Sequence, residues 1–275
     1  SVQEDIQKAQ GKFRGKIFPI LNGFLIIAIL ILFSLTLARP QSHHEKEEVS
    51  KKGIDILLAL DVSESMLAED LKPNRMTAAK ESISAFLPEE SNDRIGIVVF
   101  SGKAFTQSPL TFDTNIIKEY MESISTDSIN QRVRGLNGTA VGDAILSAVT
   151  RFQDSGDRSK VLILATDGDS NTGIDSTIAA QKADDENIKI YTIGIGKKGG
   201  AALPYYDNFG RKQYARNRDG SLVMATFNER ALKNISEQTG GKYFRAENKQ
   251  TFENILHEID QLEKRDIVVK NHTEY

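Results

Sequence analysis

Short, uninterrupted runs of Val, Ile and Leu alternate with helix-like stretches along most of this 275-residue chain, and this alternation constrains the fold more than any other feature. Strand-like runs cover residues 54–60, 95–100, 161–166 and 188–195. Strands that are apolar on both sides are typical of a parallel sheet with both faces covered. The sequence therefore predicts an α/β fold with a mostly parallel central sheet and helices on both faces.

A long apolar segment precedes the predicted α/β domain. The 22 residues from Ile17 to Ala38 carry no charged side chain. A helix of that length rises 1.5 Å per residue and spans the roughly 30 Å hydrocarbon core of a bilayer, so we expect one transmembrane helix here. A cleaved signal peptide is the alternative, but this run is longer than a typical signal-peptide core, and Thr36-Leu37-Ala38 makes a poor cleavage site. The basic residues before the run lie closer to it than those after it, which favours a cytoplasmic N-terminus.

These patterns define the expected organisation of the chain. We expect an N-terminal cytoplasmic segment at 1–16, a transmembrane helix at 17–38, a juxtamembrane linker at 39–53, the α/β domain at 54–264 and a C-terminal tail at 265–275. Within the domain, residues 197–226 form an insertion whose two turn-like clusters predict a β-hairpin. Its aromatic residues could form an exposed contact surface, although a hairpin that covers part of the core is the favoured interpretation; they are Tyr205, Tyr206, Phe209 and Tyr214.

Composition excludes several classes of function. Thirty-five basic and 38 acidic residues give a net charge of −3, so the chain lacks the basic excess typical of nucleic-acid binding and we expect no nucleic-acid partner. The absence of cysteine excludes a disulfide scaffold, a thiolate-held metal and thiol catalysis. Only four histidines are present, so any metal should be held by oxygen atoms.

Oxygen-bearing side chains follow two of the expected strands. Asp61, Ser63 and Ser65 come directly after the first strand, and Asp167 follows the strand at 161–166. Ligands of open parallel sheets bind at the carboxyl ends of the strands. Thr139, at the expected start of a helix, supplies a fifth oxygen. Each residue alone could be a turn former or a helix cap, but together they suit a hard cation such as Mg²⁺.

This pattern resembles the metal-ion-dependent adhesion site of von Willebrand factor A-type domains, whose fold is Rossmann-like. The motif is D-x-S-x-S, then a Thr, then an Asp. The resemblance implies a bound Mg²⁺, with Mn²⁺ or Ca²⁺ as substitutes. It implies that Ser63, Ser65 and Thr139 bind the ion directly, while Asp61 and Asp167 act largely through water. An open position would accept a carboxylate from a partner. Neighbouring residues are candidates for partner contact: Glu64, Met66, Asn137, Gly138 and Asp169.

Longer segments resemble the membrane-anchored bacterial Bat aerotolerance family, and its BatA member most. They include LARPQ, GIDILLALDVSESM, AEDLKPNRM, LATDGDSNTG and TGGKYFRA. The resemblance implies a domain on the periplasmic side of the bacterial inner membrane. It also implies two kinds of partner, a MoxR-type AAA+ ATPase and sibling Bat proteins, and a role in stress tolerance or envelope protein maturation.

Two features depart from that family. Glu64 stands where members usually have Gly, which adds a negative charge beside the metal loop. Members commonly carry one more membrane span before the span at 17–38 and another after the domain, whereas this chain has no second apolar run of that length. We therefore expect the complete protein to extend beyond this chain.

A non-catalytic docking module is the function we expect. The chain has no P-loop G-x-x-x-x-G-K-[ST], and no histidine lies near Ser63 or Ser65 in the sequence, so we expect no enzyme activity. Two alternatives remain. The domain could be an adaptor that activates a AAA+ ATPase as in chelatase assemblies, or it could be a surface adhesin, although the short linker argues against an adhesin.

Overall fold

The computed structural model describes residues 23–34, 53–87, 92–167, 170–207, 209–225 and 228–273. They belong to two compact units, Ser1–Ser50 and Lys51–Tyr275. In the first unit the described residues form one helix, 23–34. Within the described ranges, every helix is too short or too polar to cross a bilayer. The expected segment 1–16, the remainder of the expected span at 17–38 and almost all of the linker lie outside the described residues.

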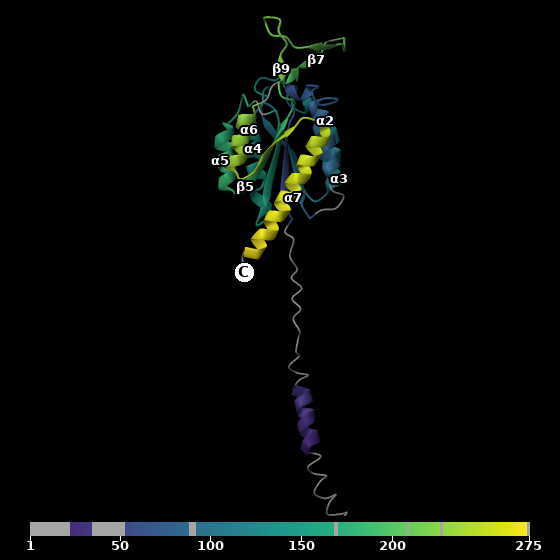
Figure 1. Ribbon diagram of the computed structural model, residues 1–275, viewed down its shortest axis with the longest axis vertical. Helices are drawn as coiled ribbons and strands as arrows, with labels where there is room; N and C mark the ends of the chain where they lie inside the picture. The colour runs from purple at the N-terminus through teal and green to yellow at the C-terminus, as the bar shows by residue number, and fades with distance from the viewer. Residues whose placement is uncertain are drawn as a thin grey trace, which may run out of the picture. The chain divides into compact units, whose positions relative to one another are not determined.

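A six-stranded sheet forms the centre of the second unit (Figure 1). Its strands are β1 (Asp55–Asp61), β2 (Arg94–Phe100), β3 (Ala104–Thr111), β4 (Lys160–Thr166), β5 (Ile188–Ile195) and β10 (Tyr243–Ala246). They lie in the order β10-β5-β4-β1-β2-β3, and only β3 runs antiparallel to its neighbour. The central position of β1 places its carboxyl end between those of β2 and β4.

Helices cover both faces of the sheet (Figure 1). They are α2 (Arg75–Phe86), α3 (Thr114–Ser123), α4 (Val141–Arg151), α5 (Ser176–Asp185), α6 (Glu229–Gln238) and α7 (Lys249–Thr273), with short 3₁₀ turns η1 (Glu64–Leu67), η2 (Thr126–Ser128) and η3 (Gln153–Ser155). One hydrophobic cluster lies under α2, α3 and α7, and the other lies under α4, α5 and α6. The structure therefore has the mostly parallel α/β architecture that the sequence predicts.

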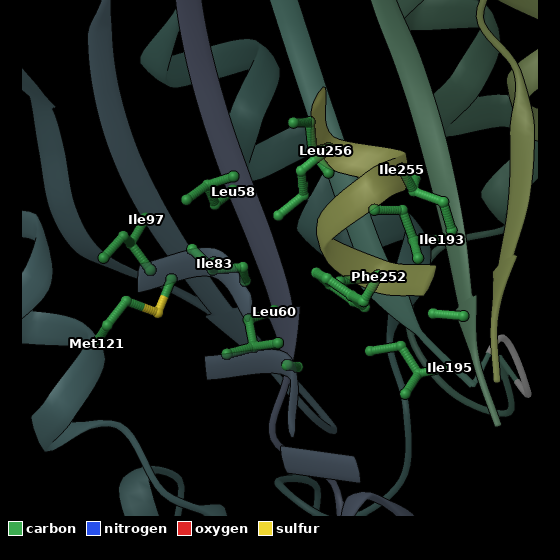
Figure 2. Packing of buried hydrophobic residues seen from close by; sticks show 14 of the residues in the cluster. Leu58, Leu60, Ile83, Ile97, Met121, Ile193, Ile195, Phe252, Ile255 and Leu256 are labelled. Atoms are coloured by element: carbon green, nitrogen blue, oxygen red, sulfur yellow. The ribbon is translucent and has the colours of Figure 1, made fainter. Parts of the chain in front are cut away.

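The alternation of side chains along β1 explains why two cores form. Leu58 and Leu60 point to the face covered by α7, where Phe252 and Leu256 pack (Figure 2). Ala59, between them, belongs to the opposite cluster. Successive strand residues point to opposite faces, so a strand buried on both sides is apolar at successive positions, as β1 is between its two terminal aspartates.

The C-terminal helix is longer than expected. α7 runs to Thr273, so residues 265–273 continue the helix rather than forming a separate tail. Its described side chains Phe252, Ile255, Leu256 and Ile259 are buried against the sheet at spacings of three and four residues.

The insertion folds as small antiparallel elements beyond the end of β5. β6 (Ala201–Ala202) pairs with β9 (Met224–Ala225), and β7 (Pro204–Tyr206) pairs with β8 (Lys212–Tyr214). Figure 1 shows these strands projecting from the sheet at the end opposite to the last turns of α7. Tyr205, Phe209 and Tyr214 are exposed, so the hairpin does not use them to cover the core, contrary to the favoured interpretation.

A charge cluster stabilises the amino end of β1. Asp55 is fully buried and accepts hydrogen bonds from Arg94 Nε at 2.9 Å and Arg158 Nε at 2.6 Å. Burial alone would raise the pKa of Asp55, but the hydrogen bonds from the two arginines hold it below its usual value of 3.8. Because the folded-state pKa is lowered, this contribution to stability is present at neutral pH and is lost as the pH falls below that value.

We expect Asp55→Asn to lower the free energy of unfolding by about 2–4 kcal/mol at pH 7, since two arginines lose their counterion. Urea denaturation of the two proteins measures this difference. Asp184→Asn, at an exposed position on α5, is the control and should change stability by less than about 0.5 kcal/mol. Equal losses for both variants would contradict the role of the cluster.

Candidate metal centre

Asp61 closes β1 and is fully buried at the carboxyl edge of the sheet. Its Oδ1 accepts the backbone N–H of Ser63 at 2.8 Å, and its Oδ2 accepts the hydroxyl of Thr166 at 2.6 Å. Burial, and next the charge of Asp167, raise the pKa of Asp61 to about 7. The carboxylate is therefore held in place but poorly compensated, which is what a nearby cation would correct.

Ser63 and Ser65 present their hydroxyls to one another. The two Oγ atoms lie 2.9 Å apart, and Ser63 is buried. Ser63 occupies the N-cap position of η1, yet its side chain makes no capping hydrogen bond. Capping of η1 therefore does not explain why a serine stands at position 63.

Thr139 is fixed between two strand ends. The N–H of Ala140 donates to the carbonyl of Ser101, just beyond β2, at 2.6 Å. The backbone of Thr139 exchanges two hydrogen bonds with Asn171, which follows β4: Thr139 N–H donates to Oδ1 at 3.0 Å and Asn171 N–H donates to the Thr139 carbonyl at 3.1 Å. α4 begins only at Val141 and has no side-chain cap, so Thr139 is not a capping residue.

Asp167 follows β4 and contacts a buried arginine. Arg75 Nη1 donates to Asp167 Oδ2 at 3.3 Å, and both side chains are almost completely buried. The same guanidinium binds Asp70 through two hydrogen bonds of 2.8 Å. One positive charge is thus shared between the carboxylates of Asp70 and Asp167, and Asp167 also interacts with the carboxyl group of Asp61.

This donor set fits a hard divalent cation. In the described part of the chain, no three histidine, cysteine, aspartate or glutamate side chains are grouped as a metal site, so hydroxyl oxygens would have to contribute. The structure brings the hydroxyls of Ser63 and Ser65 together, and it places Asp61 near enough to Asp167 for the charge of Asp167 to raise the pKa of Asp61. It places Thr139 at the same edge of the sheet through the Ser101 and Asn171 contacts. Oxygen-only coordination of this kind suits Mg²⁺, Mn²⁺ or Ca²⁺.

The candidates for partner contact have different surroundings. Glu64 and Asn137 are exposed beside the site, as a contact surface requires. Met66 is fully buried in the core, so its assignment to that surface is wrong: η1 turns it inward while Glu64 faces solvent. Gly138 has φ +95°, and a Cβ there would lie 2.5 Å from Asn171 Oδ1, so a local backbone requirement also explains this glycine. Asp169 lies outside the described residues.

Four residues that support the site are not apparent as site residues from the sequence: Asp70, Arg75, Thr166 and Asn171. Thr166 orients Asp61, Asn171 fixes the backbone of Thr139, and Arg75 with Asp70 supports Asp167. Thr166 offered one signal, a polar residue ending an otherwise apolar strand next to Asp167. Asn171 and Arg75 offered none, because their partners lie far away in the sequence.

Comparison with known proteins identifies the domain. The von Willebrand factor type A domain profile matches residues 55–261. The crystal structure of the conserved hypothetical protein BatB from Bacteroides thetaiotaomicron is 35% identical, with a TM-score of 0.68 over 77% of this chain and 100% of that chain. An aerotolerance-related membrane protein from Bacteroides fragilis, crystallised with multiple mutations to serines, is 32% identical, with a TM-score of 0.67 over 76% and 98%.

A curated relative extends the similarity towards the N-terminus. An uncharacterized protein of Borreliella burgdorferi is 26% identical over an alignment of 253 residues that covers 90% of this chain and 69% of that protein. The fold, the match over residues 55–261 and the identity to two solved relatives lead to one conclusion. The chain belongs to the von Willebrand factor type A domain family.

Proposed function

We propose that this domain binds a divalent cation, Mg²⁺ in the cell, at its carboxyl edge and docks partner proteins through that ion without catalysing a reaction. The observation that carries the proposal is the pair of serine hydroxyls 2.9 Å apart beside two buried carboxylates. Mg²⁺ prefers oxygen ligands and usually keeps some of its water, so it leaves room for an incoming carboxylate.

The residues have distinct roles in this proposal. Ser63, Ser65 and Thr139 hold the ion through their hydroxyl oxygens. Asp61 and Asp167 balance its charge and orient bound water. A bound cation supplies Lewis acidity and an exchangeable coordination position, which here accepts an aspartate or glutamate of the partner.

We further propose that the chain is a BatA-like member of the Bat group, anchored in the bacterial inner membrane by residues 17–38 with its domain in the periplasm. Its partners would be other Bat proteins and a MoxR-type AAA+ ATPase, within an assembly for envelope stress tolerance. The names of the two solved relatives, BatB and an aerotolerance-related membrane protein, support the assignment to the Bat group and an association with a membrane. The uncharged run from Ile17 to Ala38 supports the anchor.

Metal binding is tested directly with the fragment 51–275, which is a compact unit and contains the whole range matched by the von Willebrand factor type A profile. We expect Mg²⁺ and Mn²⁺ to bind, and Thr139→Ala to weaken binding by at least roughly 10–100-fold, since it removes a direct ligand and even the loss of a residue that only supports a ligand has an effect of that size. Isothermal titration calorimetry measures both ions. Thr150→Ala, at an exposed position on α4, is the matched control and should bind as wild type does. Identical affinities for the Thr139 and Thr150 variants would refute the metal site.

Docking is tested with the same variants. Membrane proteins from the native cell are passed over the immobilised fragment with Mg²⁺ or with a chelator. We expect specific proteins to be retained only by the Mg²⁺-loaded wild type. Equal retention in every condition would mean that another surface binds the partners.

A further inference from the structure

The insertion differs in charge from the rest of the chain. Residues 197–226 contain six basic and two acidic side chains, whereas the whole chain has a net charge of −3. All six basic residues are exposed: Lys197, Lys198, Arg211, Lys212, Arg216 and Arg218. The insertion is therefore a cationic projection on an otherwise acidic domain.

Aromatic side chains lie among these charges. Phe209 is 82% exposed, Tyr205 is 49% exposed and Tyr214 is 43% exposed. The guanidinium of Arg211 lies 5.2 Å from the centre of the Phe209 ring, and the ammonium of Lys212 lies 5.3 Å from that of Tyr214. Single exposed aromatics are ordinary, but three on one small hairpin beside cations resemble the composition of binding hot spots.

The insertion is attached to the elements that build the metal edge. Arg75 Nη2 donates to the carbonyl of Ala225 in β9 at 2.9 Å, and the N–H of Lys197 donates to Asp70 at 2.9 Å. The Lys212 ammonium also pairs with Glu69. Arg75 in turn contacts Asp167, so the base of the insertion lies next to the candidate metal site.

Not all of the positive charge is used within the domain. Arg211 pairs with Asp207, and Lys212 pairs with Glu69. Within the part of the chain that the structure describes, the side chains of Lys197, Lys198 and Arg218 form no ion pair. These three charges remain available to a ligand.

We propose that the insertion is a second contact surface that binds an acidic segment of the partner protein docked at the metal. The inference rests on the proposed function, since the same partner would place a carboxylate on the ion. A cationic surface beside that position attracts acidic chains and speeds their association. The exposed aromatic rings supply apolar contact area once the segment has bound.

The probe for the test is a phage-displayed library of random peptides, selected on the fragment 51–275 in Mg²⁺. We expect the selected peptides to be enriched in aspartate and glutamate. The triple variant Lys197→Gln/Lys198→Gln/Arg218→Gln should bind a selected peptide with an association rate about tenfold lower at low salt, and the difference should shrink at high salt. Surface plasmon resonance measures both rates. Phe209→Ser should mainly speed dissociation.

A matched control removes the same charge elsewhere. Lys118→Gln/Arg151→Gln/Lys182→Gln, on α3, α4 and α5, should leave both rates unchanged. The inference fails if the selected peptides are not acidic, or if the two triple variants behave alike. It also fails if the three insertion residues instead govern binding of the fragment to anionic phosphatidylglycerol vesicles.

The design separates this inference from the proposed function. Acidic peptides that bind equally well with chelator or to Thr139→Ala, but are weakened by the insertion variant, would contradict docking through the metal and still support the insertion surface. Peptides that require Mg²⁺ and Thr139 but ignore the insertion variant would support the metal site and overturn the insertion surface.

Discussion

Replacing Arg75 with methionine should lower the free energy of unfolding of the domain by about 3–5 kcal/mol, as expected when one partner of a buried ion pair is removed. Arg75 is fully buried and binds Asp70, Asp167 and the carbonyl of Ala225. Methionine fills much of the same volume without donating a hydrogen bond. Asp70 and Asp167 would therefore remain buried without their shared counterion. Urea denaturation of the fragment 51–275 measures the loss.

Two further measurements identify its cause. Asp70 accepts the N–H of Lys197, so loosening this network should speed hydrogen exchange at that amide and in β9. Adding Asp70→Asn to Arg75→Met should recover part of the stability, because one uncompensated charge is removed. Arg151→Met, at an exposed position on α4, serves as control and should change stability by less than about 0.5 kcal/mol. A loss of similar size in the control and in Arg75→Met would show that the buried network contributes nothing.

The central sheet could be predicted because its signal is local. β1, β2, β4 and β5 are largely apolar between their end residues, and β1 is buried at all seven positions, so the hydrophobic pattern alone predicts strands there. Asp61 and Asp167 could be predicted for the same reason, since each follows such a run directly. The directions in which the side chains after β1 point could not be predicted from the sequence. Glu64 and Met66 are two residues apart and belong to the same predicted loop. In the structure, however, η1 directs Glu64 towards solvent and Met66 into the core.

The supporting residues could not be predicted because their contacts are distant in sequence. Arg75 contacts Asp167 and Ala225 across separations of 92 and 150 residues, and Asn171 contacts Thr139 across 32. A single arginine at the start of a helix is ordinary by sequence, and only the fold makes Arg75 fully buried. The same limit applies to the insertion. Its turns could be predicted from the sequence, but the exposure of Tyr205, Phe209 and Tyr214 depends on the direction in which the hairpin projects.

Asp61→Asn should have opposite effects on the metal-free and the metal-bound protein. In the metal-free protein, burial and then the charge of Asp167 raise the pKa of Asp61 to about 7, from an ordinary value of 3.8. Between these two values the folded state holds a proton that the unfolded chain has lost, so stability falls as the pH rises. Asparagine cannot ionise and escapes this loss. We therefore expect the metal-free variant to exceed wild type in stability by about 2–4 kcal/mol above pH 7, with the difference disappearing towards acid pH.

With Mg²⁺ the order should reverse. A cation competes with the proton for Asp61, so wild type should gain more stability from excess Mg²⁺ as the pH rises, while Asp61→Asn should gain little at any pH. Urea denaturation from about pH 5 to pH 8, with chelator and with Mg²⁺, gives all four curves. Asp113→Asn, which alters a helix cap on α3, is the control and should shift stability equally in both conditions. A metal-free wild type whose stability does not change over this range would contradict the raised pKa. Stabilisation of Asp61→Asn by Mg²⁺ equal to that of wild type would instead show that the ion binds away from β1.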